Sequence, residues 1–313
     1  MKKLRIVLSL ITVDNDFQLE QAAAAEEGAR RLGVDIEVLF ADGDSIEQSQ
    51  QVLRFVQAKP GERPDGIIFE PIGGPALAVA ARVAIDAGIG WVVLNKQVEY
   101  VKELRQVSKV PVFMVTCDHL EMGRIQGYQL AALLPDGGSI LSIQGPAESD
   151  PCQLRVTGLS QTKPPNIQIK TMRAHWTESS AFHTVKSWLR LPTSQHEAIA
   201  AVAAQNDAMA MGAKKAFDEF TRDRGGVHLW EDVVFLGMDG VPLTGQAWVK
   251  TRVLAATIVA PPLAGTAVDM LVRALRTGEI VPEISFLAPY SFPALAAIRP
   301  HAEERRMAYA ERE

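Results

Sequence analysis

The chain has 313 residues, of which 47% are hydrophobic and 22% charged, and its formal net charge at pH 7 is −5. This length predicts two domains of roughly 150 residues each. No stretch reaches the ~20 uninterrupted apolar residues of a membrane helix, so we expect no membrane insertion. The acidic balance argues against direct nucleic-acid binding, because neutralising phosphates requires a surplus of Lys and Arg.

The N-terminal segment resembles the start of an export signal, because Met1-Lys2-Lys3 precedes an apolar run. However, Ile6–Leu10 is needed as the first strand of the fold, and no small-residue cleavage site follows it. The chain as given is therefore expected to carry no export signal. We expect a periplasmic protein if a signal was removed ahead of Met1, and a cytoplasmic protein if Met1 is the native start.

Short apolar runs that alternate with helical segments predict ten β-strands along the chain. Most of these runs are almost continuously apolar, which is typical of parallel strands covered on both faces. The predicted strands are Arg5–Leu10, Asp35–Phe40, Gly66–Glu70, Trp91–Asn95, Val112–Thr116, Ser139–Gln144, Ile167–Ala174, Ala198–Ala203, Val233–Gly237 and Leu254–Val259.

Helix start and stop signals lie between these strands. Gly33 follows a segment with Ala and Leu at helical spacing, which predicts that a helix ends there. Ser45 with Gln48 three residues later predicts a capping box at the start of the next helix. Asp118 and Asp207 are predicted to cap two further helices.

The alternation of strands and helices predicts an α/β protein with two doubly wound parallel-sheet lobes and right-handed crossovers. The ten strands fall into two similar sets of about five, one for each lobe. We expect residues 1–115 plus 261–289 to form the N-terminal lobe and residues 116–260 plus 290–313 the C-terminal lobe, joined by a multi-segment hinge. Such sheets bind ligands at the carboxyl ends of their strands, which predicts a ligand cleft between the lobes.

Polar loops follow two strands of the first set. The loop 14–18 combines an aromatic ring, which could pack on the face of a sugar, with amides and carboxylates that could bind its hydroxyls. The alternative is a helix N-cap with a buried Phe17. Asn95 and Lys96 directly follow an apolar strand, and the alternative there is a solvated loop. The candidate ligand residues of this set are Asn15, Asp16, Phe17, Gln18, Asn95 and Lys96.

The second set supplies four more candidates at the same strand ends. Arg155 could bind two ligand oxygens with its guanidinium, or lie on the surface. Trp176 could be a stacking platform, although core packing is equally compatible with the local sequence. Asn206 offers both donors and an acceptor, whereas Asp207 beside it is the expected helix cap. Asp239 could accept hydrogen bonds from two hydroxyls.

These residues occur in an order that resembles the type I periplasmic sugar-binding proteins and the ligand-binding cores of LacI-type repressors. The resemblance covers about residues 4–290, and its most specific part is the segment Gln205–Gly212. It implies the periplasmic binding protein type I fold, in which the lobes close on a monosaccharide or related polyol. The cleft residues that it implies are Asn15, Phe17, Arg155, Trp176, Asn206 and Asp239.

Three positions depart from the family pattern. Asn95-Lys96 stands where the family usually has Asp-Arg, Gln18 replaces a second aromatic residue, and Ala260 replaces the Gln of ribose-type members. These departures leave the identity of the sugar open. The exchange of Asp for Asn also removes one charge, which would make a ligand with a carboxylate or phosphate more tolerable.

The resemblance leaves three classes of function open. A solute-binding protein would deliver a sugar-like ligand to an ABC permease or a sensor partner. The ligand-sensing core of a LacI-type regulator or a cytoplasmic sensor is the alternative, although the chain as given begins at the first strand with no room for a helix-turn-helix. A sugar-modifying enzyme is the third class.

Catalytic and cofactor motifs are missing from the sequence. There is no GxGxxG after the first strand, no P-loop, no Gly-x-Ser-x-Gly elbow and no metal spacing among the six histidines. We therefore expect no catalytic residue, cofactor or metal, and place only His175 near the cleft. Cys117 and Cys152 fit no zinc spacing, and two thiols are favoured over one disulfide.

Overall fold

The computed structural model describes residues 3–72, 77–194, 197–223, 230 and 232–303. By its internal contacts the chain divides into unit 1, Met1–Cys117 with Pro261–Leu287, and unit 2, Asp118–Ala260 with Ala288–Glu313. The chain passes from one unit to the other three times, which confirms the multi-segment connection of the predicted fold. No helix within the described ranges is both long and apolar enough to cross a membrane.

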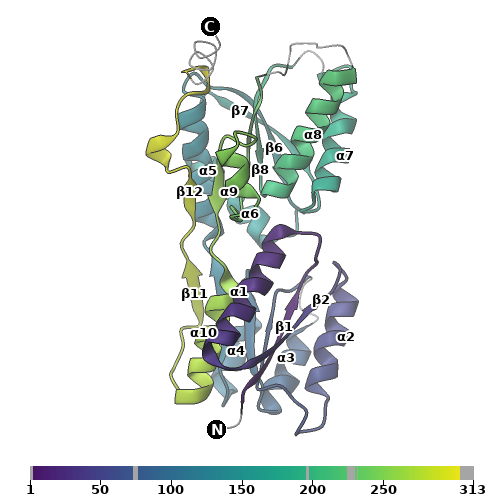
Figure 1. The fold of residues 1–313 in the computed structure, drawn as a ribbon, viewed down its shortest axis with the longest axis vertical. Coiled ribbons are helices and arrows are strands. Elements are labelled where there is room, and N and C mark those ends of the chain that lie inside the picture. The colour runs from purple at the N-terminus through teal and green to yellow at the C-terminus, as the bar shows by residue number, and fades with distance from the viewer. Residues whose placement is uncertain (1–2, 73–76, 195–196, 224–229, 231, 304–313) are drawn as a thin grey trace. The chain divides into compact units, whose positions relative to one another are not determined.

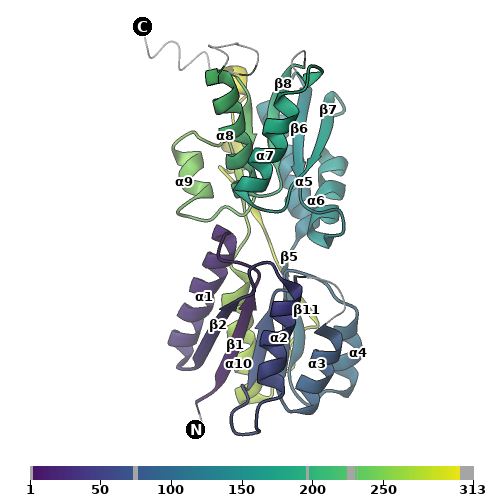
Figure 2. The same ribbon diagram turned by 90° about the vertical axis from the view of Figure 1, so that its right-hand side faces the viewer.

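Unit 1 is a six-stranded parallel sheet with helices on both faces (Figures 1 and 2). Its strands are β1 (Arg5–Leu10), β2 (Asp35–Phe40), β3 (Gly66–Phe69), β4 (Gly90–Leu94), β5 (Val112–Cys117) and β11 (Ile284–Leu287). Its helices are α1 (Asp16–Leu32), α2 (Ser45–Val56), α3 (Leu77–Asp86), α4 (Tyr100–Val107) and α10 (Leu263–Thr277). The strand order is β11-β5-β4-β3-β1-β2.

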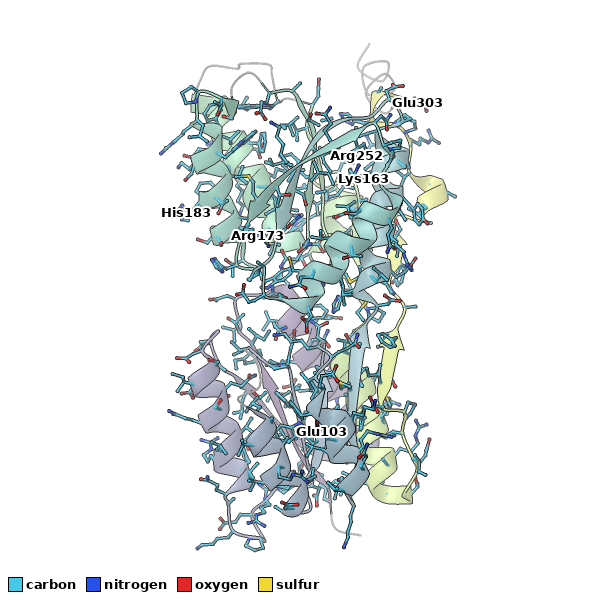
Figure 3. The ribbon with its side chains drawn as sticks, turned by 180° about the vertical axis from the view of Figure 1, so that it is seen from behind. Glu103, Lys163, Arg173, His183, Arg252 and Glu303 are labelled. Atoms are coloured by element: carbon cyan, nitrogen blue, oxygen red, sulfur yellow. The ribbon has the colours of Figure 1, made fainter. Side chains whose placement is uncertain are left out.

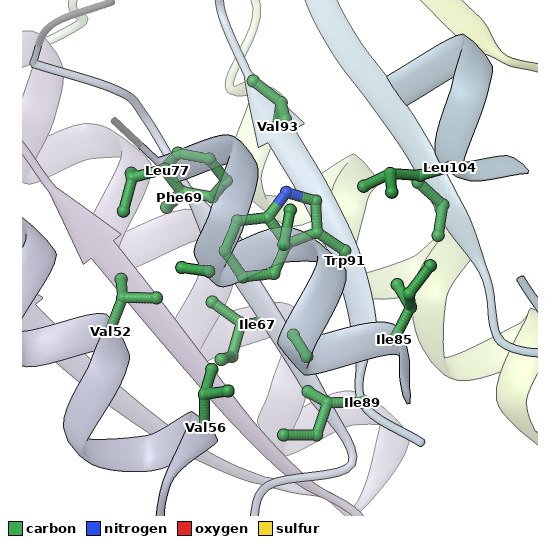
Figure 4. Close-up of a cluster of buried hydrophobic side chains, with 14 of the residues drawn as sticks. Val52, Val56, Ile67, Phe69, Leu77, Ile85, Ile89, Trp91, Val93 and Leu104 are labelled. Atoms are coloured by element: carbon green, nitrogen blue, oxygen red, sulfur yellow. The ribbon is translucent and has the colours of Figure 1, made fainter. Parts of the chain in front are cut away.

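One face of this sheet packs against α2, α3 and α4. Helices α1 and α10 pack against each other and against strands of the sheet, outside that cluster. The core of the first face gathers Val52 and Val56 of α2 around Phe69 and Trp91 of the sheet (Figure 4). The rings of Phe69 and Trp91 lie with their centroids 4.8 Å apart and are both fully buried. Because both faces are covered, the central strands β3, β4 and β5 are buried along their whole length and almost continuously apolar, as the sequence pattern indicates.

Unit 2 contains a four-stranded parallel sheet of order β7-β6-β8-β9 and an antiparallel pair, β10 with β12. The strands are β6 (Gly138–Gln144), β7 (Ile167–Arg173), β8 (Ile199–Ala204), β9 (Val234–Leu236), β10 (Thr257–Val259) and β12 (Tyr290–Phe292). The helices are α5 (His119–Leu133), α6 (Asp150–Thr162), α7 (Glu178–Leu189), α8 (Asp207–Asp223), α9 (Gly245–Lys250) and the 3-10 turn η3 (Leu295–Ala297). Helices α5 and α6 pack on one face of the sheet, and α7 and α8 on the other.

The two doubly wound parallel sheets of the predicted fold are confirmed, with differences at β10, β11 and β12. The predicted strand Leu254–Val259 is shorter, pairs antiparallel with β12 and joins the parallel sheet only through single bridges. Strands β11 and β12 were not predicted, because they are short and partly exposed and lack a continuous apolar run.

Two of the four predicted helix signals are confirmed and two are wrong. Gly33 ends α1 with φ of 65°, and Asp118 Oδ1 accepts a hydrogen bond from the backbone at the start of α5. The predicted cap at Ser45 is wrong, because Asp44 accepts hydrogen bonds from two backbone amides and Ser45 is the first residue of α2. The carboxylate of Asp44 also interacts more favourably than a hydroxyl with the positive end of the helix.

Candidate functional site

A buried polar network lies at the carboxyl ends of β1, β3 and β4 in unit 1. Glu70, directly after β3, exposes only 3% of its surface. Its Oε2 accepts a hydrogen bond from Gln18 Nε2 at 2.8 Å, and its Oε1 accepts one from Asn95 Nδ2 at 2.8 Å. Gln18 Oε1 in turn accepts from the backbone of Ile11 at 2.9 Å. Two predicted site residues therefore meet on one carboxylate.

Sequence analysis did not single out Glu70, although a signal for it was present. Like Asn95, it is a polar residue that directly follows an apolar strand. It was instead included as the last residue of the predicted strand. The structure ends β3 at Phe69, which leaves Glu70 at the edge where the other polar side chains lie.

Gln48, a buried residue of α2, supports this network. Its Nε2 donates to the backbone oxygen of Glu70 at 2.8 Å and to Ser9 Oγ at 3.3 Å, and its Oε1 accepts from Ile72 N at 3.0 Å. Gln48 is 1% exposed, so its side chain fixes the loop after β3 from inside the protein. This explains why Gln48 does not act in the predicted capping box.

The four remaining candidates of unit 1 lie around this network. Asn15 Oδ1 caps α1 by accepting from Phe17 N at 2.9 Å, and the ring of Phe17 is buried, as the alternative for this loop expects. Asp16 is in the first turn of α1, and Lys96 follows Asn95; both are half-buried. Their contact with a ligand remains a prediction.

Arg155 occupies the corresponding polar edge of unit 2 and is 5% exposed, so it is not a surface arginine. Its Nη1 donates to the backbone oxygen of Gln205, which follows β8. Its Nη2 lies 3.4 Å from His119 Nδ1, and since a guanidinium has no acceptor, the histidine nitrogen accepts. The Cζ atom lies 5.5 Å from the ring centroid of Trp176, within cation–π distance.

Trp176 is held by its neighbours on several sides. Asn206 Nδ2 donates to the Trp176 backbone oxygen at 2.8 Å. The indole packs so closely on Gly145 that a Cβ there would lie 2.1 Å from Cζ2 of the ring. Trp176 is half-buried and packs against the core under α7 and α8, as the core-packing alternative expects. Its stacking on a ligand remains a prediction.

The cap of α8 is Asn206 and not the predicted Asp207. Asn206 Oδ1 accepts from Met209 N at 2.8 Å and therefore caps the helix. The predicted cap at Asp207 is wrong, because its Oδ2 accepts from Gly240 N at 2.7 Å and its Oδ1 from Thr257 Oγ1 at 2.6 Å. One position further along the helix, the carboxylate points toward the loop after β9 rather than back to its own backbone.

Three candidate residues have an unusual backbone conformation. Among the described non-glycine residues, φ is positive at Asn95 (61°), Trp176 (63°) and Asp239 (99°), and otherwise only at Asp42 and Arg252. Asn and Asp adopt this region at modest cost, but a bulky residue such as Trp rarely does. Each of the three lies in the loop after a parallel strand, where strained conformations are associated with ligand sites.

The remaining histidine and cysteine candidates show no catalytic arrangement. His175 is exposed, and its backbone amide donates to Ser180 Oγ at 3.0 Å. Cys152 is a buried thiol, and Arg173 at the end of β7 donates to Gly145 O beside it (Figure 3). No three His, Cys, Asp or Glu side chains of the described ranges form a group that could hold a metal ion. His196 and His228 lie outside the described residues.

A family model described as a periplasmic binding protein domain matches residues 6–280, which include all ten candidate residues. The chain belongs to the periplasmic binding protein family. The resemblance identified in the sequence is thereby confirmed, and the α/β fold of the two units agrees with this family.

Relatives and solved structures of the family match most of the chain. A D-allose-binding periplasmic protein of Escherichia coli (strain K12) is 24% identical over 87% of this chain and 85% of its own. A ribose import binding protein of Salmonella typhimurium is 27% identical over 84% and 81%. An ABC transporter periplasmic solute binding protein from Actinobacillus succinogenes with bound D-allose has a TM-score of 0.79 at 23% identity, covering 92% and 97%. A Caulobacter myo-inositol binding protein bound to myo-inositol has a TM-score of 0.75 at 22% identity, covering 92% of each chain.

These family members are binding proteins rather than enzymes. The two structures share the fold with this chain, while their identity is too low to transfer a ligand.

Proposed function

We propose that this periplasmic binding protein binds a small neutral polyol, a monosaccharide or a cyclitol, and presents it to an ABC permease or a sensor partner. The ligand would bind to polar side chains at the carboxyl ends of the parallel strands. A conformational change on binding would then signal occupancy to the partner. Binding without turnover is part of this proposal.

The observation that carries the proposal is the set of left-handed backbone conformations at Asn95, Trp176 and Asp239. Each of these conformations costs free energy, and each belongs to a residue whose side chain can bind a hydroxyl or stack on a C–H face. Such strain persists only where the surrounding structure holds it, as Asn206 and Gly145 do for Trp176. The proteins similar to this chain that bind D-allose, ribose or myo-inositol all take neutral polyhydroxylated ligands.

A thermal-shift screen tests the ligand class. The probes are D-allose, D-ribose and myo-inositol, with D-gluconate as an anionic comparison. At a concentration of 100 times Kd, a ligand stabilises the folded protein by about 2.7 kcal/mol, so a binding polyol will raise Tm by several degrees.

The Asp239→Ala variant provides the site-specific control for that screen. It should fold, because the backbone bonds of residue 239 to Ile258 and Ala260 do not involve the side chain. It should lose the ligand-induced shift in Tm, because a buried hydroxyl of the ligand would lose its acceptor. A full shift in the variant, or turnover of a bound polyol by the wild-type protein, contradicts the proposal.

A further inference from the structure

We propose that Glu70 is a positioning residue that orients the amides of Gln18 and Asn95 and makes this edge of unit 1 select neutral polyols over anionic ones. The inference rests on the proposed function, because it assigns Asn95 to the ligand site. It adds a residue and a charge rule that the family resemblance does not contain.

The carboxylate dictates how both amides are turned. An ionised carboxylate can only accept hydrogen bonds, so Gln18 and Asn95 must both present their NH2 groups to it, each at 2.8 Å. The Oδ1 of Asn95 is therefore fixed on the side away from Glu70, as an acceptor for a donor such as a hydroxyl. An amide with no such partner could rotate by half a turn and offer either group.

The backbone of Glu70 is held as firmly as its side chain. Its N–H donates to Ser9 O at 3.0 Å, and its oxygen accepts from Gln48 Nε2 at 2.8 Å. Gln48 is 1% exposed and Glu70 is 3% exposed. The carboxylate therefore cannot turn toward water, and the orientation of the two amides is fixed before any ligand binds.

The charge of an ionised Glu70 changes the expectation for the ligand. Asn95 alone favours tolerance of an anionic ligand, because the family has Asp at that position. In its ionised form, Glu70 places a negative charge next to the Asn95 amide in a poorly solvated position, where electrostatic interactions are stronger than in water. A ligand carboxylate beside Asn95 is therefore disfavoured. The half-buried Lys96 is the nearest cation in sequence. The variant Lys96→Met tests how much its charge contributes to the preference between neutral and anionic ligands.

Two substitutions of Glu70 distinguish the effect of its charge from the effect of its side-chain length. Glu70→Gln keeps the shape but removes the charge and replaces one acceptor with a donor, so one amide must lose its partner. Glu70→Asp keeps the charge but shortens the side chain by one methylene. Glu47→Gln makes the same chemical change at an exposed position of α2 and is the matched control.

The first measurement needs no ligand. In 1H–15N spectra of the wild-type protein, the NH2 pairs of Gln18 and Asn95, assigned with Gln18→Ala and Asn95→Ala, should be shifted and slow to exchange. Both pairs should move in Glu70→Gln and neither in Glu47→Gln. Random-coil positions in the wild-type protein, or no change in Glu70→Gln, overturn the positioning role.

The second measurement is titration calorimetry with D-allose, D-ribose, myo-inositol and D-gluconate. Glu70→Gln should bind the neutral probes about tenfold more weakly, because a buried hydrogen bond to a charged group is lost. Its preference for neutral over anionic probe should also fall about tenfold, whereas Glu70→Asp should keep that preference. Unchanged preference in Glu70→Gln overturns the charge rule. If no neutral probe binds the wild-type protein while the NH2 signals respond, the proposed ligand class fails and the positioning role stands.

Discussion

At the scale of single residues, Asp207 supports the loop that carries Asp239. Its two carboxylate oxygens accept from Gly240 N and Thr257 Oγ1, at 2.7 and 2.6 Å. The carboxylate is enclosed, since an added Cβ at Gly237 or at Gly245 would lie 2.0 Å from one of its oxygens. Asp207 therefore holds the loop after β9 and the start of β10 in place.

We predict that Asp207→Ala lowers the free energy of unfolding by about 3 kcal/mol, because it leaves two buried donors without an acceptor. Thr257→Val removes only one of these bonds and should cost about 1.5 kcal/mol. Urea denaturation of the three proteins measures both values. Equal stability of Asp207→Ala and the wild type would show that the carboxylate does not hold the loop.

Gly145 is the residue that makes room for Trp176. A Cβ at this position would lie 2.1 Å from Cζ2 and 2.3 Å from Cη2 of the indole, so the ring must move. We predict that Gly145→Ala weakens polyol binding at least about tenfold, because a displaced ring loses stacking and its contact with Arg155. Gly61→Ala is the control, because an added Cβ there meets nothing within 4 Å. Calorimetric titration distinguishes the two, and identical affinities would remove Trp176 from the site.

The candidate residues could be predicted from one rule, that polar groups following parallel strands gather at one sheet edge. The rule selected Gln18, Asn95 and Asn206, and in the structure all three are buried and hydrogen-bonded. It could not assign their partners, because those lie far away in sequence. Glu70 is 52 residues from Gln18, and Arg155 is 50 from Gln205.

At the scale of elements, the long apolar strands were predictable and the short strands β11 and β12 were not. Strands β1 and β2 agree with the predicted bounds at both ends. In β1 burial of the last five residues leaves a nearly continuous apolar run, whereas β2 is partly exposed and its apolar residues are interrupted by Glu37. Strands β11 and β12 each have three or four partly exposed residues, and their pairing depends on tertiary contacts with β5 and β10. Sequence periodicity carries no information about such contacts.

The start of α4 gives unit 1 a measurable response to alkaline pH. Burial raises the pKa of Tyr100 to about 12 from an ordinary value of 10.0, although a hydrogen bond from Trp91 Nε1 opposes the shift. Because the pKa is higher in the folded state, the neutral phenol contributes stability that is fully present below pH 10. That contribution is lost as the pH rises from about 10 toward 12.

We predict that Tyr100→Phe loses stability less steeply than the wild type between pH 10 and 12, because the buried titrating group is gone. Tyr128→Phe, at a side chain that is 46% exposed, should follow the wild-type curve. Urea midpoints measured between pH 8 and 11.5 give the slopes. If the stability of Tyr100→Phe and of the wild type fell equally steeply with pH, the raised pKa of Tyr100 would be contradicted.

At the scale of the whole molecule, the chain combines two parallel-sheet units that each carry a buried polar edge. The chain as a whole belongs to the periplasmic binding protein family, whose model matches residues 6–280 across both units. The sequence order of the strands predicted this arrangement of units. It could not name the sugar, because Asn95, Gln18 and Ala260 depart from the family pattern together.

Calorimetric titration of the wild-type protein and of one variant in each unit tests the central claim most directly. With the neutral polyol that binds best, the account predicts one site per chain in the wild-type protein. It also predicts that Asn95→Ala and Asp239→Ala each weaken binding at least about tenfold, since each removes a proposed hydrogen bond to the ligand. Full affinity in either variant, with the fold intact, would contradict the proposed ligand-binding residues.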